Sequence, residues 1–406
     1  MIDYYSATRP FWLVNLAEQL KTPTLVRVDI NVPVVGGRIV EDSLRLRVYG
    51  EILGLMAQYA GLVVVAHQGR RGGKDFISLE QHCQALRKYL PKGVEIEFVP
   101  FSEMYSERLR ERIKSLDTGK ILLLDNIRMD EEETKFDPQG SRFISFFKGL
   151  VARCVNDAFS VWHRSHTSVM ALPYIAETYV GLRSIYELKV LREVLGCRRE
   201  EAAVIVGGAK MDKAEYLLEI PERMECFTGG LIGQAAARAK GYDLGPENNR
   251  VIESKVSPEM FDLIRRAVEK YNIRHPIDFV VRERGEDIVY TLGDVSKARG
   301  PIMDIGPETV DRYAEELSGM LVKIRAGPLG VYEEGYANGV NLTRRIAGSG
   351  LIFLGGDTTA ELARFSLEGA ILSSGGVICL GGGAFLHGLA GRHYPSIDLL
   401  IGKGKP

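Results

Sequence analysis

Short runs of consecutive apolar, often β-branched residues alternate along the chain with longer amphipathic stretches. In the first half the runs lie at 24–28, 62–66, 95–99, 121–124 and 154–155, and in the second half at 203–206, 225–228, 278–281, 321–324, 351–354 and 377–380. Apolar runs separated by helical segments are typical of parallel sheets that helices cover on both faces. The pattern therefore predicts an α/β protein with two doubly wound parallel sheets, one in each half of the chain.

Four of the stretches between these runs carry apolar residues at helical spacing. They lie at 43–59, 78–90, 184–195 and 257–271. In the last of them Ser257 is the predicted N-cap, and Pro258 occupies the first helical position. The stretch 184–195 connects the two halves, so we place the boundary between two domains near residue 185.

Length and composition narrow the class of protein. The 406 residues exceed the usual size of one hydrophobic core and favour two domains. With 45% hydrophobic and 26% charged residues, the chain has the composition of an ordinary soluble globular protein, and no apolar run approaches the length of a membrane span. The net charge of −1 indicates no nucleic-acid or anionic membrane partner. The five cysteines lie far apart without a CxxC pair, which favours a reducing cytoplasm.

Basic and polar side chains follow four of the predicted strands in the first half. The residues concerned are Asp29, Asn31, Arg45, His67, Arg70, Arg128 and Arg164. Ligands of such sheets bind outside the carboxyl ends of the strands, so we expect these side chains to share one rim. Arginine binds oxyanions with two parallel donors, and Asp and Asn bind hydroxyls, which suits a small phosphorylated carboxylate. Any one of them alone is more often an ordinary loop residue or part of an Asx turn; their coincidence at equivalent positions favours a site.

Glycine-rich segments follow five of the predicted strands in the second half. They lie at 207–208, 229–230, 327–330, 355–356 and 381–383. Glycines before helices let backbone amides approach phosphate, and Lys210 and Lys213 could meet phosphate oxygens. Asp357 could hold Mg²⁺, which prefers a carboxylate together with substrate phosphates. One double glycine is more often a tight turn, but five predict a nucleotide site, and the P-loop, GxGxxG and protein-kinase motifs are absent.

Ten segments resemble, in the same order, segments of the phosphoglycerate kinase family. They read VRVDINVP (26–33), DSLRLR (42–47), AHQGRRGG (66–73), LLLDNIR (122–128), VNDAFSVWHRSH (155–166), VIVGGAK (204–210), MDIGPET (303–309), AGPLGVYE (326–333), LGGDTT (354–359) and GGGA (381–384). Some departures on the nucleotide side resemble archaeal-type members of the family. Two residues, where three are usual, separate Lys210 from Lys213, and Ala326, Leu354 and Leu380 replace the usual Asn, Gly and Thr.

The resemblance implies the two-lobed fold of that family, in agreement with the two sheets that the apolar runs predict. Residues 1–183 are then the phosphoglycerate-binding domain, 184–196 a hinge helix and 197–394 the nucleotide-binding domain. The tail 395–406 is expected to pack back on the first domain. The resemblance places the active site in the cleft, which domain closure completes.

The resemblance also implies roles residue by residue. The phosphoglycerate site comprises Asp29, Asn31, Arg45, His67, Arg70, Arg128 and Arg164. The nucleotide site comprises Gly208, Lys210, Lys213, Gly229, Gly230, Pro328, Glu333, Gly356, Asp357 and Thr358. Arg45, Lys210 and Lys213 are the implied catalytic residues. Glu333 is implied to bind the ribose, and Asp357 to hold Mg²⁺.

The implied activity is that of a phosphotransferase whose acceptor is a carboxyl group. It is the reversible, Mg²⁺-dependent transfer between 1,3-bisphosphoglycerate with ADP and 3-phosphoglycerate with ATP, in glycolysis and gluconeogenesis. The acceptor carboxylate is already ionised at neutral pH, so the protein has only to position the groups and neutralise charge. The implied partners are these substrates, with no nucleic acid or membrane, for a cytoplasmic monomer or homodimer.

Two alternatives belong to different classes of function. One is another acid kinase that forms an acyl phosphate, although the Asp29 and Asn31 pair suits a hydroxyl-bearing acid. The other is an inactive nucleotide and phosphate sensor on the same scaffold, although Arg45, Lys213 and Asp357 are all retained. Turnover of 3-phosphoglycerate with MgATP separates these alternatives from the implied kinase.

Overall fold

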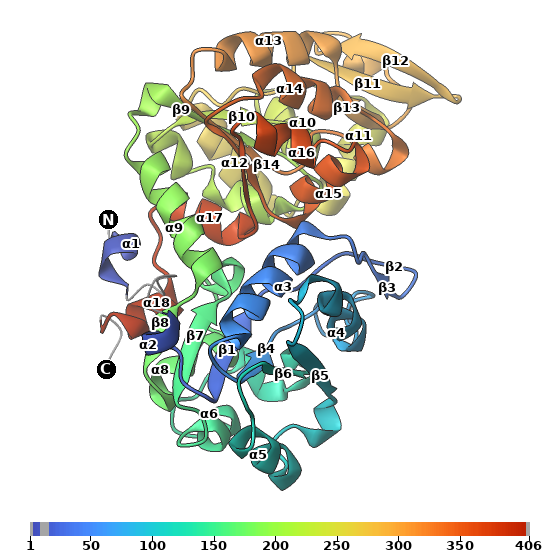
Figure 1. Cartoon of the computed structure of the whole chain (residues 1–406). Coiled ribbons are helices and arrows are strands. Elements are labelled where there is room, and N and C mark those ends of the chain that lie inside the picture. Colours follow the sequence, from blue (N-terminus) through green and yellow to red (C-terminus); the bar gives the residue numbers. More distant parts are fainter. Residues whose placement is uncertain (1–2, 9–15, 403–406) are drawn as a thin grey trace. The chain divides into compact units, whose positions relative to one another are not determined.

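The computed structural model describes residues 3–8 and 16–402, apart from the side chain of Asp357. The chain divides into two compact units, the first formed by 1–192 with 393–406 and the second by 193–392 (Figure 1). The division falls within helix α9, which spans Leu182–Leu195 and begins two residues before the predicted helix at 184–195. Among the described residues, no helix has the length and apolar character needed to cross a membrane.

The first unit is built on a six-stranded parallel sheet with the order β5-β6-β4-β1-β7-β8. Its strands are β1 (Thr24–Val28), β4 (Leu62–Val65), β5 (Glu95–Val99), β6 (Lys120–Leu124), β7 (Arg153–Asp157) and β8 (Thr178–Val180). The central strands are buried throughout because helices cover both faces, whereas the edge strand β5 exposes Glu95 and Glu97. All five apolar runs predicted for this half are confirmed as parallel strands, and the three-residue β8 is additional.

Helices and a small hairpin complete the first unit. The helices include α3 (Leu44–Ala57), α4 (Glu80–Leu86), α5 (Glu107–Lys114), α6 (Arg142–Phe147), α7 (Thr167–Met170), α8 (Leu172–Ile175) and, from the C-terminal tail, α18 (Pro395–Leu400), and the hairpin pairs β2 (Val34–Val35) with β3 (Arg38–Ile39). Helix α3 lies within the predicted 43–59, and Ser43 caps it by accepting a hydrogen bond from the amide of Arg45 at 3.3 Å. The stretch predicted as one helix at 78–90 forms α4 followed by a single 3₁₀ turn.

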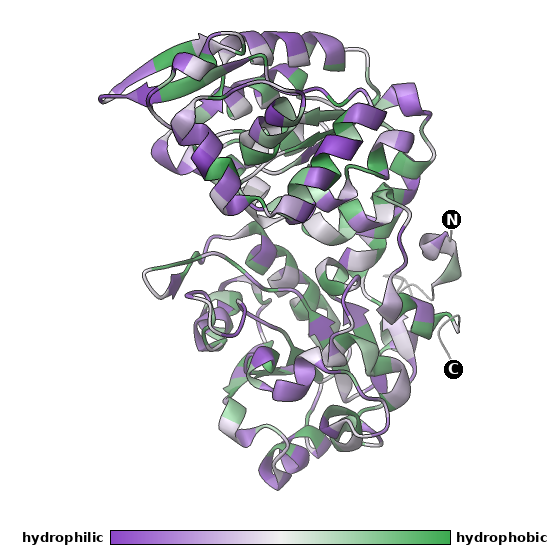
Figure 2. Ribbon diagram, turned by 180° about the vertical axis from the view of Figure 1, so that it is seen from behind, coloured by the Kyte–Doolittle hydropathy of each residue, from purple (hydrophilic) through white to green (hydrophobic). Residues whose placement is uncertain are grey.

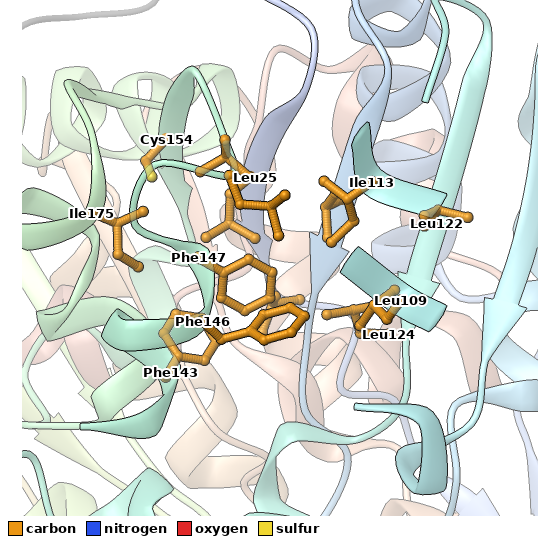
Figure 3. Packing of buried hydrophobic residues seen from close by; sticks show 14 of the residues in the cluster. Leu25, Leu109, Ile113, Leu122, Leu124, Phe143, Phe146, Phe147, Cys154 and Ile175 are labelled. Carbon is orange, nitrogen blue, oxygen red and sulfur yellow. The ribbon is translucent and has the colours of Figure 1, made fainter. Parts of the chain in front are cut away.

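A core of aliphatic and aromatic side chains fills one side of this sheet (Figure 3). Leu25 of β1 and Leu124 of β6 meet Phe143 and Phe147 of α6, and all four are at most 1% exposed. Burying side chains of this size contributes about 1.5–3 kcal/mol each. This packing fixes the strands, and therefore the loops at their carboxyl ends, in one arrangement.

The described end of the chain packs on the first unit next to the segment that carries Arg164. The Tyr394 ring contacts that of Trp162, with ring centroids 6.1 Å apart, and the Ser396 hydroxyl donates to the Trp162 carbonyl oxygen at 3.3 Å. Trp162 is fully buried, and its indole N–H donates to Asn156 Oδ1 on β7 at 2.8 Å. The tail thus supports the loop that follows β7.

The second unit contains a five-stranded parallel sheet with the order β10-β9-β14-β15-β16. Its strands are β9 (Ala202–Val206), β10 (Glu225–Thr228), β14 (Val322–Ala326), β15 (Leu351–Leu354) and β16 (Val377–Cys379). The helices of this unit are α10 (Gly230–Ala239), α11 (Pro246–Lys255), α12 (Pro258–Lys270), α13 (Pro307–Leu317), α14 (Asn338–Ile346), α15 (Gly356–Arg364), α16 (Glu368–Ser373) and α17 (Gly382–Leu389). The second predicted parallel sheet is confirmed, and in both units the strands form an apolar interior (Figure 2).

The run at 278–281 does not join that sheet, so the prediction of a parallel strand there is wrong. It forms part of β11 (Asp278–Glu283), which pairs antiparallel with β12 (Glu286–Thr291) and β13 (Ile302–Ile305) in a separate sheet. A two-residue turn at Arg284 and Gly285 joins β11 to β12, with φ of 52° and 89°, as tight hairpins require. A buried apolar run has the same appearance in either kind of sheet, and only its pairing partners decide between them.

Candidate functional site

The first group of predicted residues lies at the carboxyl end of β1. Asp29 is buried there, and its carboxylate pairs with the guanidinium of Arg45 in the first turn of α3. The same carboxylate accepts hydrogen bonds from the backbone amide of Asn31, at 3.1 Å, and from the Ser160 hydroxyl. Burial lowers the pKa of Arg45, whereas Tyr49 and Glu187 act to raise it. The structure therefore brings Asp29 and Arg45 into direct contact.

Asn31 connects this turn to the loop that follows β4. Its side-chain Oδ1 accepts a hydrogen bond from the amide of Gly69 at 2.9 Å. Gly69 has a φ of +65°, and a Cβ at this position would lie 2.3 Å from the carbonyl oxygen of Asp75, so only glycine fits the loop. The carbonyl oxygen of Gly69 accepts a hydrogen bond from Arg128. Three strand ends are thus joined into one rim.

His67 lies beneath this rim and is 3% exposed. Its Nδ1 lies 3.0 Å from Nη2 of Arg27, a fully buried arginine on β1. Burial and the charges of Arg27 and Arg128 hold the pKa of His67 well below its usual range, so its ring is neutral and accepts from Arg27. Sequence reasoning missed Arg27, although a single arginine inside the apolar run TLVRV is a signal for a buried charge.

A buried carboxylate balances Arg27 from the other side. Arg27 Nε donates to the Ser168 hydroxyl at 2.8 Å, and that hydroxyl donates to Glu133 Oε1 at 2.8 Å. The amide of Ser168 also donates to Glu133 Oε2 at 2.9 Å. Burial raises the pKa of Glu133, while Arg27 acts to lower it. The basic rim therefore rests on a hydrogen-bonded network of buried polar groups.

Arg70, Arg128 and Arg164 line one cavity of about 530 Å³, called here the arginine cavity. Lys135 and His166, which sequence reasoning did not select, line it as well. Burial, Arg164 and Arg27 lower the pKa of Arg128 to about 10, so it stays charged at neutral pH. Burial, Arg128 and Arg27 lower the pKa of His166 to about 3, so its ring is uncharged. Arg71 lines the cavity as a fourth arginine, beside the carboxylates of Asp130 and Glu131. Guanidinium groups gathered around one cavity are suited to bind an anion.

Glycine-rich loops follow β9, β10 and β14 in the second unit and approach one another closely. A Cβ on Gly207 would lie 2.3 Å from the carbonyl oxygen of Pro328, and one on Gly230 would lie 2.9 Å from the amide nitrogen of Gly208. Gly230 has a φ of +55°, which glycine adopts without strain. The three loops can meet only because they carry no side chains at these points.

Lys213 points at the loop after β14. A Cβ on Gly327 would lie 2.6 Å from the Lys213 ammonium nitrogen, and one on Gly208 would lie 3.6 Å from it. Thr358, one of the predicted nucleotide residues, is fully buried. Its hydroxyl accepts from the amide of Gly327 at 2.8 Å and donates to the carbonyl oxygen of Leu354 at 2.8 Å. Thr358 thus holds this loop against the start of α15.

A buried ion pair lies next to the same loop. Arg325 and Glu361 are at most 2% exposed, and Arg325 Nη2 lies 2.8 Å from Glu361 Oε2. Arg325 also donates to the carbonyl oxygens of Gly339, at 2.7 Å, and Gly327, at 3.4 Å. Burial raises the pKa of Glu361, and Arg325 acts to lower it. The pair is a structural support for the loop.

Five of the predicted nucleotide residues line a second cavity, of about 760 Å³, called here the glycine-loop cavity. They are Gly208, Lys210, Gly230, Pro328 and Glu333. Lys213, Gly229, Gly356 and Thr358 do not line it, and the side chain of Asp357 lies outside the described residues. The described residues include no cluster of three or more His, Cys, Asp or Glu that could hold a metal ion.

Several residues of the glycine-loop cavity were missed by sequence reasoning. They include Leu231, Gln234, Phe279, Met303 and Asp304. Burial raises the pKa of Asp304 to about 7, and its two oxygens accept from the amides of Ile305, at 2.9 Å, and Asn338, at 2.8 Å. The segment at 303–309 resembles the family. However, the sequence prediction assigned β11 to the parallel sheet, so it did not indicate that β11 and β13 together form a wall of this cavity.

A family model described as phosphoglycerate kinase matches residues 17–392. The phosphoglycerate kinase of Thermococcus kodakarensis is 32% identical over 407 residues, which cover 96% of this chain and 97% of that protein. The phosphoglycerate kinase of Aeropyrum pernix is 34% identical, with 93% of this chain and 92% of that protein covered.

Solved structures are similar over nearly the whole chain. The crystal structure of phosphoglycerate kinase from Pyrococcus horikoshii OT3 superposes with a TM-score of 0.84 at 27% identity, covering 97% of this chain and all of that one. The structure of phosphoglycerate kinase from Coxiella burnetii superposes with a TM-score of 0.71 at 24% identity, covering 98% of this chain and 100% of that one, which supports the fold.

Proposed function

This chain belongs to the phosphoglycerate kinase family, and from that premise we propose which of its residues bind each substrate. The protein is a kinase that transfers a phosphoryl group to the carboxyl group of 3-phosphoglycerate. Another acid kinase or an inactive sensor is not favoured. The observation that carries the assignment is the arginine cavity in one unit and the glycine-loop cavity in the other.

The arginine cavity binds the 3-phosphate of the acceptor. Arg70, Arg128 and Arg164 supply the positive charge there. The neutral ring of His166 adds a hydrogen-bonding group to the cavity without adding to the positive charge of the arginines and Lys135 that line it. A phosphate group offers several acceptor oxygens, and planar guanidinium groups bind such oxygens in pairs. The phosphate therefore anchors the substrate by charge and by geometry.

The rim at β1 binds the rest of the acceptor. Asp29 and Asn31 supply acceptors and a donor for the hydroxyl, and His67 is proposed to act with them. Arg45, held by Asp29, stabilises the phosphoryl group during its transfer. The acceptor carboxylate needs no general base, since it is ionised at neutral pH. The work of these residues is to position the acceptor and to balance charge.

The glycine loops bind the nucleotide. Amides at Gly208, Gly229, Gly230 and Gly356 are proposed to face the phosphates, because glycine lets the backbone approach them closely. Lys210 and Lys213 neutralise phosphate charge, and Lys213 is held against the loop after β14. Pro328 and Glu333 line the glycine-loop cavity, where Glu333 binds the ribose hydroxyls. Thr358 maintains the shape of the loop.

Mg²⁺ is proposed to enter with the nucleotide. Such an ion needs only one or two carboxylates, because substrate phosphates supply its other ligands. Asp357 stands in the first turn of α15, directly after β15, which suits this single-carboxylate arrangement. When bound, the ion neutralises the charge of the phosphates. Asp357 is thus the residue assigned to hold it.

Three further parts of the proposal concern the cell and the whole molecule. Domain closure over both substrates, predicted from the sequence, stays a prediction. A cytoplasmic location is supported by five free cysteines, four of them buried. The absence of a nucleic-acid or membrane partner stays a prediction from the sequence. The oligomeric state, monomer or homodimer, stays a prediction as well.

Calorimetric titration of two variants tests the assignment of the two cavities. Arg164→Ala should weaken binding of 3-phosphoglycerate about 10- to 100-fold and leave ADP binding unchanged, because a charged hydrogen bond contributes about 1.5–3 kcal/mol. Glu333→Ala should weaken ADP binding and leave 3-phosphoglycerate binding unchanged. Glu315→Ala, an exposed position on α13, is the control and should change neither. The reverse pattern, or no change in either affinity, would contradict the assignment.

A further inference from the structure

A glutamine side chain lies in the glycine-loop cavity with its amide unpaired. Gln234 is on α10, one turn after Gly230, and is 8% exposed. Within the described ranges 3–8 and 16–402, no group of the protein is within hydrogen-bond reach of its carboxamide. Its polar atoms remain accessible and are not among the buried unsatisfied groups of the described residues, so a ligand in the cavity can pair with them without displacing a hydrogen bond of the protein. The arrangement suits a ligand that supplies a donor and an acceptor there.

The other amide of this cavity shows the contrast. Asn248 on α11 also lines the cavity, and its Nδ2 donates to the carbonyl oxygens of Leu244, at 3.0 Å, and Gly300, at 3.2 Å. Its Oδ1 accepts from the amide of Ile302 at 2.8 Å. Asn248 is therefore committed to holding the wall of the cavity. The carboxamide of Gln234 makes no such hydrogen bonds to the described residues.

The surroundings of Gln234 suit a flat, largely apolar group with a polar edge. Leu231, Phe279 and Met303 line the same cavity, and each is less than 10% exposed. Leu231 is on α10, as Gln234 is, whereas Phe279 and Met303 come from the antiparallel strands β11 and β13. These apolar side chains share the cavity with polar and charged residues, and such a combination suits a planar ring that has a polar edge. A nucleobase is such a ring.

We propose that Gln234 reads the hydrogen-bonding edge of the purine base of the nucleotide. This rests on the proposed function, which puts the phosphates at the glycine loops and the ribose at Glu333. The carboxamide offers one acceptor and two donor hydrogens, which match the 6-amino group and an adjacent ring nitrogen of adenine. When the carboxamide is rotated by 180°, its oxygen and nitrogen exchange places, and the group then matches a 6-oxo purine, whose edge has donor and acceptor exchanged. The group recognised is thus a purine with a polar substituent at position 6.

Calorimetric titration with two diphosphates tests this role. The probes are ADP and purine riboside 5′-diphosphate, which carries hydrogen in place of the 6-amino group. Wild-type protein should bind ADP about tenfold more tightly than the second probe. Gln234→Met, which keeps the length of the side chain but removes the amide, should bind the two equally. Gln58→Met, the same change at an exposed position on the first unit, should keep the wild-type ratio.

A second variant and a stability measurement distinguish recognition of the base by Gln234 from a merely structural role of this residue. Gln234→Glu can accept but not donate as a carboxylate, so it loses the hydrogen bond to the acceptor of either purine edge and should bind both ADP and inosine diphosphate more weakly than wild type does. Without nucleotide, Gln234→Met should unfold close to the wild-type temperature, because the amide makes no hydrogen bond to the described part of the protein that the substitution would remove. Equal probe ratios in wild type and Gln234→Met, with ADP still bound, would overturn the role of Gln234 and leave the proposed function intact. Wild-type protein that binds neither diphosphate would overturn the nucleotide site itself.

Discussion

Arg45, in the first turn of α3, forms an ion pair with Asp29, the residue that follows β1. Both side chains are at most 10% exposed, and Ser43 fixes the start of the helix that carries Arg45. The ion pair restricts the rotamers of the Arg45 side chain before substrate binds, because the Asp29 carboxylate holds the guanidinium in one orientation. Such preorganisation is what a group that stabilises a transition state requires.

Replacing Arg45 should therefore affect rate more than binding. We expect Arg45→Ala to lower kcat by about 10²–10³ with little change in the Kd of 3-phosphoglycerate, as for other transition-state donors. Arg45→Lys should rescue only part of the rate, since an ammonium lacks the planar fork. Arg47→Ala, an exposed neighbour on the same helix, is the control and should be near wild type. Steady-state kinetics with calorimetry measures both quantities, and a near-wild-type kcat in Arg45→Ala would remove Arg45 from the catalytic residues.

The buried Arg325 and Glu361 pair should matter for folding. Glu361→Ala leaves the Arg325 guanidinium buried without its counter-charge, which should lower the free energy of unfolding by about 3–5 kcal/mol. Glu269→Ala, which breaks an exposed pair with Arg265, should change stability little. Urea denaturation measures the difference. Equal stability of the two variants would show that Arg325 finds another partner.

The uncharged state of His166 predicts a pH dependence of stability. Its pKa is lowered to about 3 in the folded protein, whereas an unfolded chain has the ordinary value of 6.5. Between these values the unfolded state binds more protons, so this group makes the fold more stable as pH rises and less stable as pH falls. The stability advantage of wild type over His166→Gln should shrink between pH 7 and pH 4, as urea denaturation at each pH would show. An advantage that is the same at both pH values would contradict the burial of a neutral His166.

Much of the framework could be predicted from the sequence because buried parallel strands leave continuous apolar runs. The runs at 24–28, 95–99, 225–228 and 351–354 coincide with strands at both ends. The antiparallel sheet of β11, β12 and β13 could not be predicted in this way. Its exposed strand β12 carries no apolar run, and the pairing of β11 depends on partners distant in the chain.

The residues of the candidate site could likewise be predicted from the sequence only in part. Arg70, Arg128 and Arg164 follow strand ends, so their sequence positions alone predict that they share an edge of the sheet. Gln234 lies inside a helix, and nothing in its local sequence indicates that its side chain lines a cavity without a hydrogen-bond partner among the described residues. Arg27 and Glu133 likewise acquire their significance from burial and from Ser168 between them. Such residues are recognised only when the packed side chains are known.

The central claim is that this chain phosphorylates the carboxyl group of 3-phosphoglycerate. ADP formation from MgATP should be measured with 3-phosphoglycerate, glycerate and acetate as acceptors, each with and without Mg²⁺. We expect rapid turnover with 3-phosphoglycerate and Mg²⁺ together, because only that acceptor carries both the phosphate proposed to bind in the arginine cavity and the hydroxyl-bearing acid proposed to bind at the rim at Asp29. Turnover with acetate but not with 3-phosphoglycerate would indicate a different acid kinase, and no turnover with any acceptor would indicate a sensor; either result would contradict the claim.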